Sequence, residues 1–308
     1  MNDLVKRLQK NLNFVIRGKP EEIDFLITAF LGGGNILLND VPGVGKTTLA
    51  KALAASINGT FHRIQFTPDL LPADIMGGSI YNPREGTFVF RKGPIFANIL
   101  LADEINRASP RTQSSLLEAM AEGQVSIEGR TYPLAPPFWV VATQNPIEFH
   151  GTYPLPEAQL DRFAMQLTIG YPPEEAEMEI LATHKLHQPI DSIGPVSTLE
   201  EILEAQNAVR QVHVDEDVAR YLIEIVAATR KDLRLTLGAS PRGSLTLYRM
   251  AQAHAYLTGR PEVVPDDVKT VAVPTLAHRL ALETKARYSG VFSEGIVLEI
   301  LARTKVPV

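Results

Sequence analysis

The glycine-rich segment Pro42-Gly43-Val44-Gly45-Lys46-Thr47-Thr48 carries the strongest indication of the fold. It follows the apolar run Ile36-Leu37-Leu38 and precedes the helix-favouring residues 49–54, so it stands where a strand turns into a helix. Glycine has no Cβ atom, and backbone N–H groups can therefore close around phosphate oxygens at the positive end of the following helix. This context predicts a phosphate-binding loop.

Side chains in and beyond this segment have the chemistry that a bound nucleoside triphosphate requires. Lys46 can reach the β and γ phosphates, and Thr47 can offer its hydroxyl to Mg²⁺. Asp103 ends a fully apolar strand and is expected to be the second ligand of that ion, while Glu104 beside it can orient a water molecule. We therefore predict a site for ATP and Mg²⁺, in which the nucleotide contacts Pro42, Gly43, Val44, Gly45, Lys46, Thr47 and Thr48.

The loop departs from the usual pattern G-x-x-x-x-G-K-[ST] at its first position, where Asp40 replaces glycine. The local turn is therefore expected to differ slightly, although the residues that phosphate binding needs are all present. The alternative interpretation is a glycine-rich turn together with a core strand that ends in two solvated acids. The strand, turn and helix context makes this alternative much less favoured.

Composition limits the classes to which the chain can belong. Its 308 residues suffice for one large or two unequal domains, and 45% hydrophobic with 21% charged residues is average for a globular protein. The absence of cysteine excludes disulfides, cysteine-ligated zinc and thiol catalysis, and it is compatible with a reducing cytosol. His184 and His187 lie three residues apart on an expected helix, where a structural role outweighs a metal-binding one.

Charge and hydropathy point to a soluble, cytoplasmic protein. The formal net charge is -5, and lysines and arginines are scattered, so nucleic acid is not expected as a partner. The longest apolar runs are far shorter than a membrane span needs. The N-terminus is typical of a charged amphipathic helix, with Leu4, Leu8 and Leu12 on one face.

The first two-thirds of the chain alternates between apolar strands and helical stretches. Strands are expected at residues 35–38, 61–66, 99–102, 138–142 and 164–169. Most of these runs are continuously apolar, which is typical of a parallel sheet covered on both faces. The fold class is therefore a doubly wound, mainly parallel α/β core, with its site at the carboxyl ends of the strands. This core is expected to span residues 1–189.

Two segments interrupt this alternation, and a different region follows it. Residues 80–90 and 125–134 are expected to form hairpins that either contact a partner or substrate or serve as structural flaps. Residues 190–308 are expected to form an all-helical lid domain, with residues 189–195 as the hinge. The expected helix starts are Thr198 with Glu201 as a capping box, Asp215, Ser240-Pro241 and Pro265-Asp266.

Three further polar residues stand where chemistry is expected. Asn145 follows an apolar strand and can reach the attacking water or the γ phosphate, although Asn-Pro is also an ordinary turn. Arg162 lies at a helix end, away from the nucleotide's own loop, where an arginine is usually solvated. Arg242 lies in the first turn of a lid helix, an unfavourable place for a cation unless it meets an anion.

The sequence resembles the MoxR family of AAA+ ATPases over nearly its whole length. The resemblance rests on the runs Asp103-Glu104-Ile105-Asn106-Arg107-Ala108, Leu116-Leu117-Glu118-Ala119-Met120, Ala142-Thr143-Gln144-Asn145-Pro146, Leu155-Pro156-Glu157-Ala158-Gln159-Leu160-Asp161-Arg162-Phe163 and Ser240-Pro241-Arg242. It implies a P-loop NTPase core in which Walker A contains Lys46 and Thr47, and Walker B contains Asp103 and Glu104. It further implies that the catalytic residues include Asn145 as sensor 1, Arg162 as the arginine finger and Arg242 as sensor 2. The strip on the adenine side is implied to contain Val15, Ile16 and Gly18.

The same resemblance implies an assembly and a role. The family forms hexameric rings with each nucleotide between two subunits, and the two hairpins correspond to its helix-2 insert and pre-sensor hairpin. Its members remodel or mature protein complexes in a chaperone-like way, often with von Willebrand factor A domain proteins. Three alternatives stay open: a magnesium-chelatase-like subunit, a nucleic-acid motor, and a scaffold that binds nucleotide without hydrolysing it. The intact Glu104 argues against the scaffold.

Overall fold

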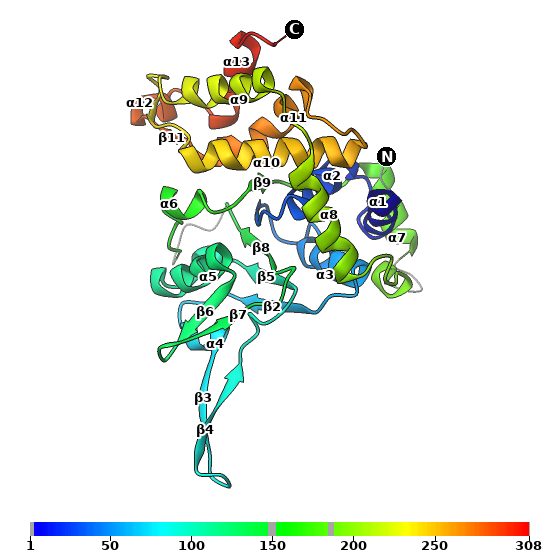
Figure 1. Ribbon diagram of the computed structural model, residues 1–308, viewed down its shortest axis with the longest axis vertical. Helices are drawn as coiled ribbons and strands as arrows, with labels where there is room; N and C mark the ends of the chain where they lie inside the picture. The colour runs from blue at the N-terminus through cyan, green and yellow to red at the C-terminus, as the bar shows by residue number, and fades with distance from the viewer. Residues whose placement is uncertain (1–2, 147–151, 184–187, 308) are drawn as a thin grey trace.

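The computed structural model describes residues 3–146, 152–183 and 188–307 (Figure 1). His184 and His187 lie outside the described residues. In the described part of the chain, no helix is both long and apolar enough to cross a membrane.

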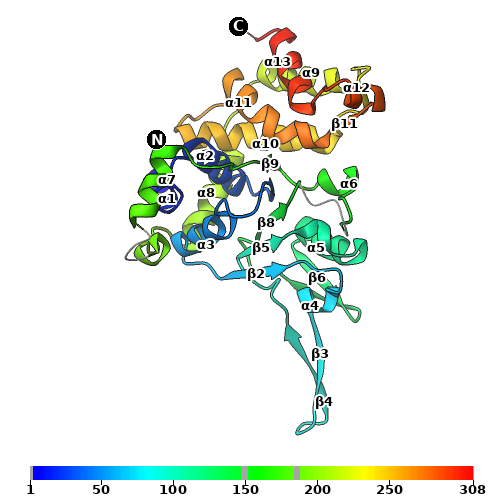
Figure 2. The same ribbon diagram turned by 180° about the vertical axis from the view of Figure 1, so that it is seen from behind.

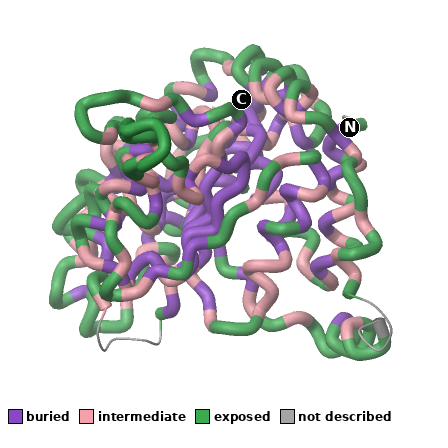
Figure 3. Tube along the Cα trace, turned by 90° about the horizontal axis from the view of Figure 1, so that it is seen from below, coloured by how far each residue is buried: buried purple, intermediate pink, exposed green. Residues whose placement is uncertain are grey.

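A five-stranded parallel sheet forms the centre of the first part of the chain. Its strands run in the order β2 (Phe61–Gln65), β5 (Ile99–Asp103), β8 (Trp139–Gln144), β1 (Ile36–Asn39) and β9 (Met165–Leu167). Each strand begins within one residue of its expected start, which confirms the predicted parallel sheet. Their continuous apolar character follows from burial on both faces. Figure 3 shows the buried strands side by side inside the molecule.

The two faces of the sheet pack into separate apolar clusters. Ile36, Leu101 and Val141 belong to the first, with the buried faces of α1 (Asp3–Val15), α2 (Pro20–Leu31) and α3 (Lys46–Ser56). Adjacent residues of a strand point to opposite faces, so Leu37 and Leu100 join α5 (Pro110–Glu122) in the second cluster. Helices on both faces make this a doubly wound α/β core.

The second part of the chain is mostly helical and follows α7 (Glu174–Thr183) and a 3₁₀ turn at Pro189–Ser192. Its helices are α8 (Leu199–Gln211), α9 (Glu216–Thr229), α10 (Pro241–Thr258), α11 (Pro265–Leu276), α12 (Thr284–Tyr288) and α13 (Ser293–Arg303). A short antiparallel ladder of β10 (Leu235–Leu237) and β11 (Ala281–Leu282) was not expected. Helix α10 packs along α2, and one apolar cluster continues from the sheet into this lid (Figure 1). The boundary at residues 189/190 stays a prediction.

The expected helix starts are present, with one difference. Asp215 and Ser240 each accept a backbone N–H bond as N-caps. Thr198 accepts from the N–H of Glu201 at 3.3 Å, but the expected capping box is replaced by other contacts of the Glu201 carboxylate. That carboxylate pairs with Arg7 of α1 and accepts from Ser197 Oγ, and it therefore ties the start of α8 to the first helix instead.

Both expected hairpins are present. The first consists of β3 (Gly77–Asn82) and β4 (Thr87–Lys92), which follow α4 (Pro72–Met76), and the second of β6 (Gln124–Ile127) and β7 (Arg130–Pro133). In both Figures 1 and 2 the β3–β4 hairpin projects away from the body of the molecule. Tyr81 and Phe88 near its tip are 52% and 73% exposed. At its base, Phe90 stacks on Tyr132 of the second hairpin with 4.2 Å between ring centroids.

Candidate functional site

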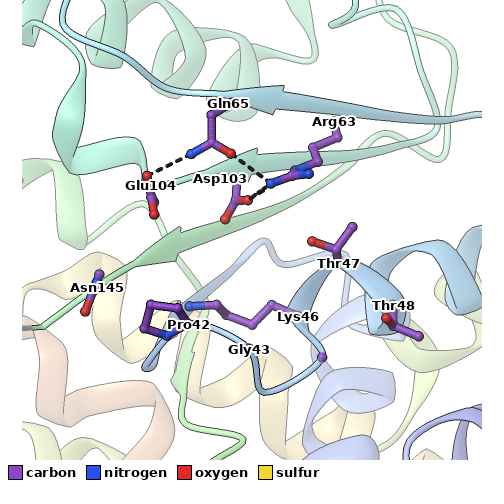
Figure 4. A pocket seen from close by; sticks show the side chains of 11 residues that line it. Pro42, Gly43, Lys46, Thr47, Thr48, Arg63, Gln65, Asp103, Glu104 and Asn145 are labelled. Atoms are coloured by element: carbon purple, nitrogen blue, oxygen red, sulfur yellow. Dashed lines mark hydrogen bonds and ion pairs between the residues drawn. The ribbon is translucent and has the colours of Figure 1, made fainter.

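A cavity of about 370 Å³ opens at the carboxyl ends of the central strands, where a doubly wound sheet binds its ligands. Its lining comes from the loop before α3, from the first turn of α3, from β2, and from the ends of β5 and β8 (Figure 4). It is lined by Pro42, Gly43, Gly45, Lys46, Thr47, Thr48, Arg63, Gln65, Asp103, Glu104 and Asn145. The structure therefore brings most of the predicted site residues together.

The loop before α3 has the backbone that a phosphate cradle needs. Gly43 and Gly45 have φ values of 88° and 93°, in the left-handed region that favours glycine. A Cβ atom added to Gly43 would meet no atom within 4 Å, so the backbone there faces open space. Gly45 is the N-cap of α3, and the free N–H groups of the first turn lie at the positive end of that helix.

Lys46 is the cation of this cavity. Its Nζ atom donates to the carbonyl oxygen of Asp40 at 2.8 Å. Burial lowers the pKa of Lys46, and the nearby carboxylates of Asp40, Asp103 and Glu104 oppose that effect. A partly desolvated ammonium group interacts strongly with an anion, so this side chain is suited to bind phosphate.

Asp40 explains the departure of the loop from the usual glycine. Its Oδ2 atom accepts hydrogen bonds from the N–H groups of Ile169 (2.6 Å) and Gly170 (2.9 Å), and Oδ1 accepts from the N–H of Val41 (2.9 Å). The side chain is 3% exposed. A buried carboxylate thus ties the start of the loop to the segment after β9, a contact that glycine cannot make.

The acidic pair at the end of β5 is held by hydrogen bonds on both sides. Asp103 Oδ1 accepts from Thr143 Oγ1 at 2.6 Å, and Thr143 Oγ1 in turn accepts from the N–H of Glu104 at 2.8 Å. Asp103 Oδ2 accepts from Arg63 Nη2 at 2.7 Å. Glu104 has a φ of 56°, so the chain turns sharply after the strand and directs the two carboxylates differently.

Glu104 has two partners of its own. Its Oε2 atom accepts from Gln65 Nε2 at 2.7 Å (Figure 4). The same atom accepts from Arg107 Nη1 at 3.0 Å. Sequence reasoning missed Arg63 and Gln65, which reach the acids from β2. The available signal was the polar character of β2, since the run Phe61-His62-Arg63-Ile64-Gln65 is unusual for a strand in an otherwise apolar parallel sheet.

The donor set fits magnesium bound to a triphosphate. The Thr47 hydroxyl and the Asp103 carboxylate both line the cavity, and both are the hard oxygen donors that Mg²⁺ prefers. Within residues 3–146, 152–183 and 188–307, no group of three or more histidine, cysteine or acidic side chains is placed to hold a metal. Mg²⁺ usually takes its remaining ligands from phosphate oxygens and water.

A second cavity of about 290 Å³ adjoins the first and shares Gly43, Gly45 and Thr48 with it. Val15, Ile16 and Val44 of the predicted nucleotide-binding residues line it. Gly18 is not part of the lining. Its φ of 72° and the 2.8 Å from an added Cβ atom to atoms of Ala176 and Pro173 show that it shapes the turn by close packing.

Two further predicted residues, Arg162 and Arg242, also lie outside these cavities. Arg162 follows α6 (Glu157–Leu160), and its Nη1 atom donates to the carbonyl oxygen of Leu117 at 2.7 Å. In Figures 1 and 2, α6 and α3 lie on opposite sides of the sheet. Arg242 is exposed in the first turn of α10. Asn145, by contrast, lines the first cavity.

Comparisons with known proteins agree with this architecture. Residues 35–165 match the family model described as the ATPase family associated with various cellular activities (AAA), and residues 227–300 match the AAA lid domain. A crystal structure of a Cytophaga hutchinsonii protein superimposes with a TM-score of 0.92 at 39% identity, covering 99% of this chain and 96% of that one.

Sequence relatives extend over nearly the whole chain. It is 48% identical to the Bacillus subtilis protein YeaC, covering all of this chain and 96% of that protein. It is 42% identical to the chaperone MoxR1 of Mycobacterium tuberculosis, covering 95% of this chain and 80% of that one. Identity to the protein MoxR of Paracoccus denitrificans is 32%, over 88% and 86% of the two chains. These relatives, the two family models and the geometry of the nucleotide loop agree, and the chain belongs to the MoxR family of AAA+ ATPases.

Proposed function

We propose that this chain hydrolyses ATP with Mg²⁺, as part of a hexameric ring, to drive the remodelling or maturation of protein complexes. The observation that carries the proposal is the convergence of Lys46, Thr47, Asp103 and Glu104 on one cavity beside a glycine loop. These are the groups that bind a triphosphate, hold its metal ion and activate a water molecule.

In this proposal the loop and Lys46 bind the phosphates. The N–H groups at the start of α3 and the Lys46 ammonium group offset the negative charge, and Thr47 and Asp103 hold Mg²⁺. The metal, when bound, supplies electrostatic stabilisation of the phosphate oxygens. Val15, Ile16 and Val44 offer an apolar wall for the adenine in the adjoining cavity.

Glu104 is the proposed general base. Gln65 and Arg107 orient its carboxylate, and Asn145 lines the same cavity and can hold the attacking water by a hydrogen bond. A general base typically contributes about 10²- to 10⁴-fold in rate. Glu104 therefore distinguishes a hydrolysing enzyme from the scaffold alternative.

Arg162 completes the site of a neighbouring subunit in this proposal. Its place beyond α6, outside the chain's own cavity, supports action between subunits. An arginine supplied in trans typically contributes about 10³- to 10⁵-fold in rate. A monomer is then expected to bind ATP yet hydrolyse it slowly. Arg242 on α10 would respond to the γ phosphate and couple lid position to hydrolysis.

The exposed hairpin tip supports a role in handling other proteins. Tyr81 and Phe88 lie on a projecting hairpin and offer apolar area to a client. The name of the Mycobacterium tuberculosis relative, chaperone MoxR1, supports the same role. The expected partners are a protein client and a von Willebrand factor A domain protein, and the expected location is the cytoplasm.

A mixing experiment tests the proposed site. A Lys46→Ala chain and an Arg162→Ala chain are each expected to be inactive, because each lacks one half of every site. Mixed rings contain some interfaces with an intact lysine and an intact arginine, so part of the ATPase activity should return. Stable mixed rings without any recovery would contradict action between subunits.

A second experiment addresses the client. A Glu104→Gln chain should hold ATP and retain its client, because binding persists while hydrolysis stops. Proteins that it captures with ATP but not with ADP are candidate clients. A metal-chelatase partner among them would favour the magnesium-chelatase-like alternative. A DNA affinity that falls steeply with salt would favour the nucleic-acid motor.

A further inference from the structure

We propose that Asp161 is a positioning residue that links the helical lid to Arg162, so that the lid of one subunit adjusts the arginine offered to the next. This inference rests on the proposed action of Arg162 between subunits. It adds a named connection between that arginine and the nucleotide state of its own chain.

The carboxylate of Asp161 is bound from the lid on both oxygens. Oδ1 accepts from Arg279 Nε at 2.9 Å, and Oδ2 accepts from Ser240 Oγ at 2.8 Å. Asp161 is also the C-cap residue of α6 and directly precedes Arg162 in the chain. Its position therefore sets where the backbone of Arg162 begins.

Arg279 adds further hydrogen bonds to this contact. Its side chain is 1% exposed, and Nη2 donates to the carbonyl oxygens of Phe163 (2.6 Å) and Asp161 (3.3 Å). Burial lowers the pKa of Arg279 to about 10, and Asp161 opposes this effect. The guanidinium group therefore stays charged at neutral pH, and a buried cation that loses its partner is costly. Residues 161–163 are thus held to the lid.

Ser240 connects the same carboxylate to the first turn of α10. Its hydroxyl oxygen accepts the N–H of Gly243 at 3.2 Å as the N-cap and donates to Asp161. Arg242, the residue proposed to respond to the γ phosphate, lies between them in the chain. Gly243 itself packs closely, since an added Cβ atom would lie 3.2 Å from Cδ of Arg279. The start of α10 thus contacts Asp161 through Ser240 and lies against Arg279, so we expect a movement of this helix end to reach both partners of the carboxylate.

The other end of Arg162 is held differently. Its guanidinium group donates to the carbonyl oxygen of Leu117 on α5, which belongs to the core and not to the lid. The backbone on either side of Arg162 is thus bound to the lid, whereas its guanidinium group is bound to the core. A shift of the lid changes the distance that the side chain must span, and so changes how Arg162 is presented at the surface.

The test uses mixed rings in which one chain supplies only the nucleotide site and carries Arg162→Ala. The other chain supplies only the arginine and carries either Lys46→Ala, which leaves its own loop empty, or Glu104→Gln, which holds ATP without hydrolysis. We expect the ATP-holding donor to restore more activity than the empty donor. Adding Asp161→Asn to the donor should abolish this difference and lower kcat about tenfold, with the KM for ATP unchanged.

Placing Asp161→Asn on the site-supplying chain instead is the matched control. There its own arginine is already removed, so any loss reports only the effect of the substitution on that chain's own lid, and it should be clearly smaller than the loss in the donor placement. Equal losses in both placements, or donors that differ just as much with Asp161→Asn present, would overturn the inference. A parent mixture that recovers no activity would contradict the proposed function itself, which separates the two failures.

A second variant covers the case in which Asp161→Asn unfolds the chain. Ser240→Ala removes one lid contact and leaves the pair of Asp161 with Arg279 in place. Because it also removes an N-cap, Asp215→Ala at the start of α9 serves as the capping control. Ser240→Ala on the donor should reduce the advantage of bound ATP, whereas Asp215→Ala should not. Equal behaviour of the two variants would count against the link.

Discussion

The loop before α3 and the junction of α6 with the lid each present a cation, but they hold it in different ways. Lys46 is held locally, by a carbonyl group six positions earlier, inside the cavity that it lines. Arg162 follows Asp161, whose partners Ser240 and Arg279 lie 79 and 118 positions away. The glycines and the lysine of the first region lie within one segment, so we expect its contacts with the nucleotide phosphates to depend little on the lid. The second depends on how the whole chain is arranged, so we expect it to report that arrangement to a neighbour.

The substitution with the largest expected effect changes the second region and leaves the first intact. Arg162→Ala should lower kcat of the assembled protein by about 10³- to 10⁵-fold, since it removes the charge that we propose stabilises the transition state of the neighbouring subunit. Affinity for ATP should change less than about twofold, because the loop is intact. Turnover and fluorescent-nucleotide binding measure the two quantities. Arg220→Ala, in an exposed pair with Glu216, is the control, and a similar loss in that variant would contradict the assignment.

The next effect lies entirely within the first region. Glu104→Gln should lower kcat by about 10²- to 10⁴-fold, because a neutral amide cannot accept the proton of water. It keeps the shape of the side chain and its hydrogen bond from Gln65, so ATP should still bind. Single-turnover hydrolysis measures the chemical step. Fast single turnover with slow release of product would mean that Glu104 does not act in the chemical step.

A third substitution tests how far the loop depends on its contact with the distant segment after β9. Asp40→Gly restores the usual glycine but leaves the N–H groups of Ile169 and Gly170 without their acceptor. The free energy of unfolding should fall by about 1 to 3 kcal/mol, as measured by denaturant titration. Asp40→Asn retains one acceptor oxygen and should lose less. A glycine variant that is as stable as the parent would show that the carboxylate tie is dispensable.

The smallest expected effect concerns an ion pair in the lid that belongs to neither region. Hydrogen bonds from Arg234 lower the pKa of Asp232 to about 2. A lowered folded-state pKa stabilises the protein above the unfolded value near 4, and this contribution disappears as the pH falls through about 2. Asp232→Asn should therefore lower the free energy of unfolding by about 1 to 2 kcal/mol at pH 7, and by roughly half as much at pH 3. ATPase activity at pH 7 should be unchanged, and a changed rate would mean that this end of the lid also acts on the site.

The first region could be predicted almost completely from sequence. Gly43, Gly45, Lys46 and Thr47 lie in one short run, and their φ angles and helix start follow from local chemistry. The five strands were equally clear, because burial on both faces leaves a continuous apolar pattern. Their carboxyl ends had to meet at one edge of the sheet, which brought Asp103 and Asn145 to the loop.

The remaining contacts depend on pairings between distant segments. Arg63 and Gln65 reach the acids only because β2 lies beside β5, and Asp40 has its role only because residues 169 and 170 return to it. Nothing near Asp161 in the sequence points to Arg279. The missing capping box has the same origin. The Glu201 carboxylate contacts Arg7, a partner that only tertiary packing brings close, instead of the start of its own helix.

The ring stack of Phe90 on Tyr132 has a mechanical consequence. It fastens the projecting hairpin to β6–β7, and β6 is separated from α5 by Gly123 alone. In the proposed ring, a force on a polypeptide bound at the tip would therefore reach α5, the helix whose Leu117 carbonyl group accepts a hydrogen bond from the guanidinium group of Arg162. Under the proposed function, tension on a bound client and the timing of ATP hydrolysis in the adjacent subunit would be coupled through this one helix.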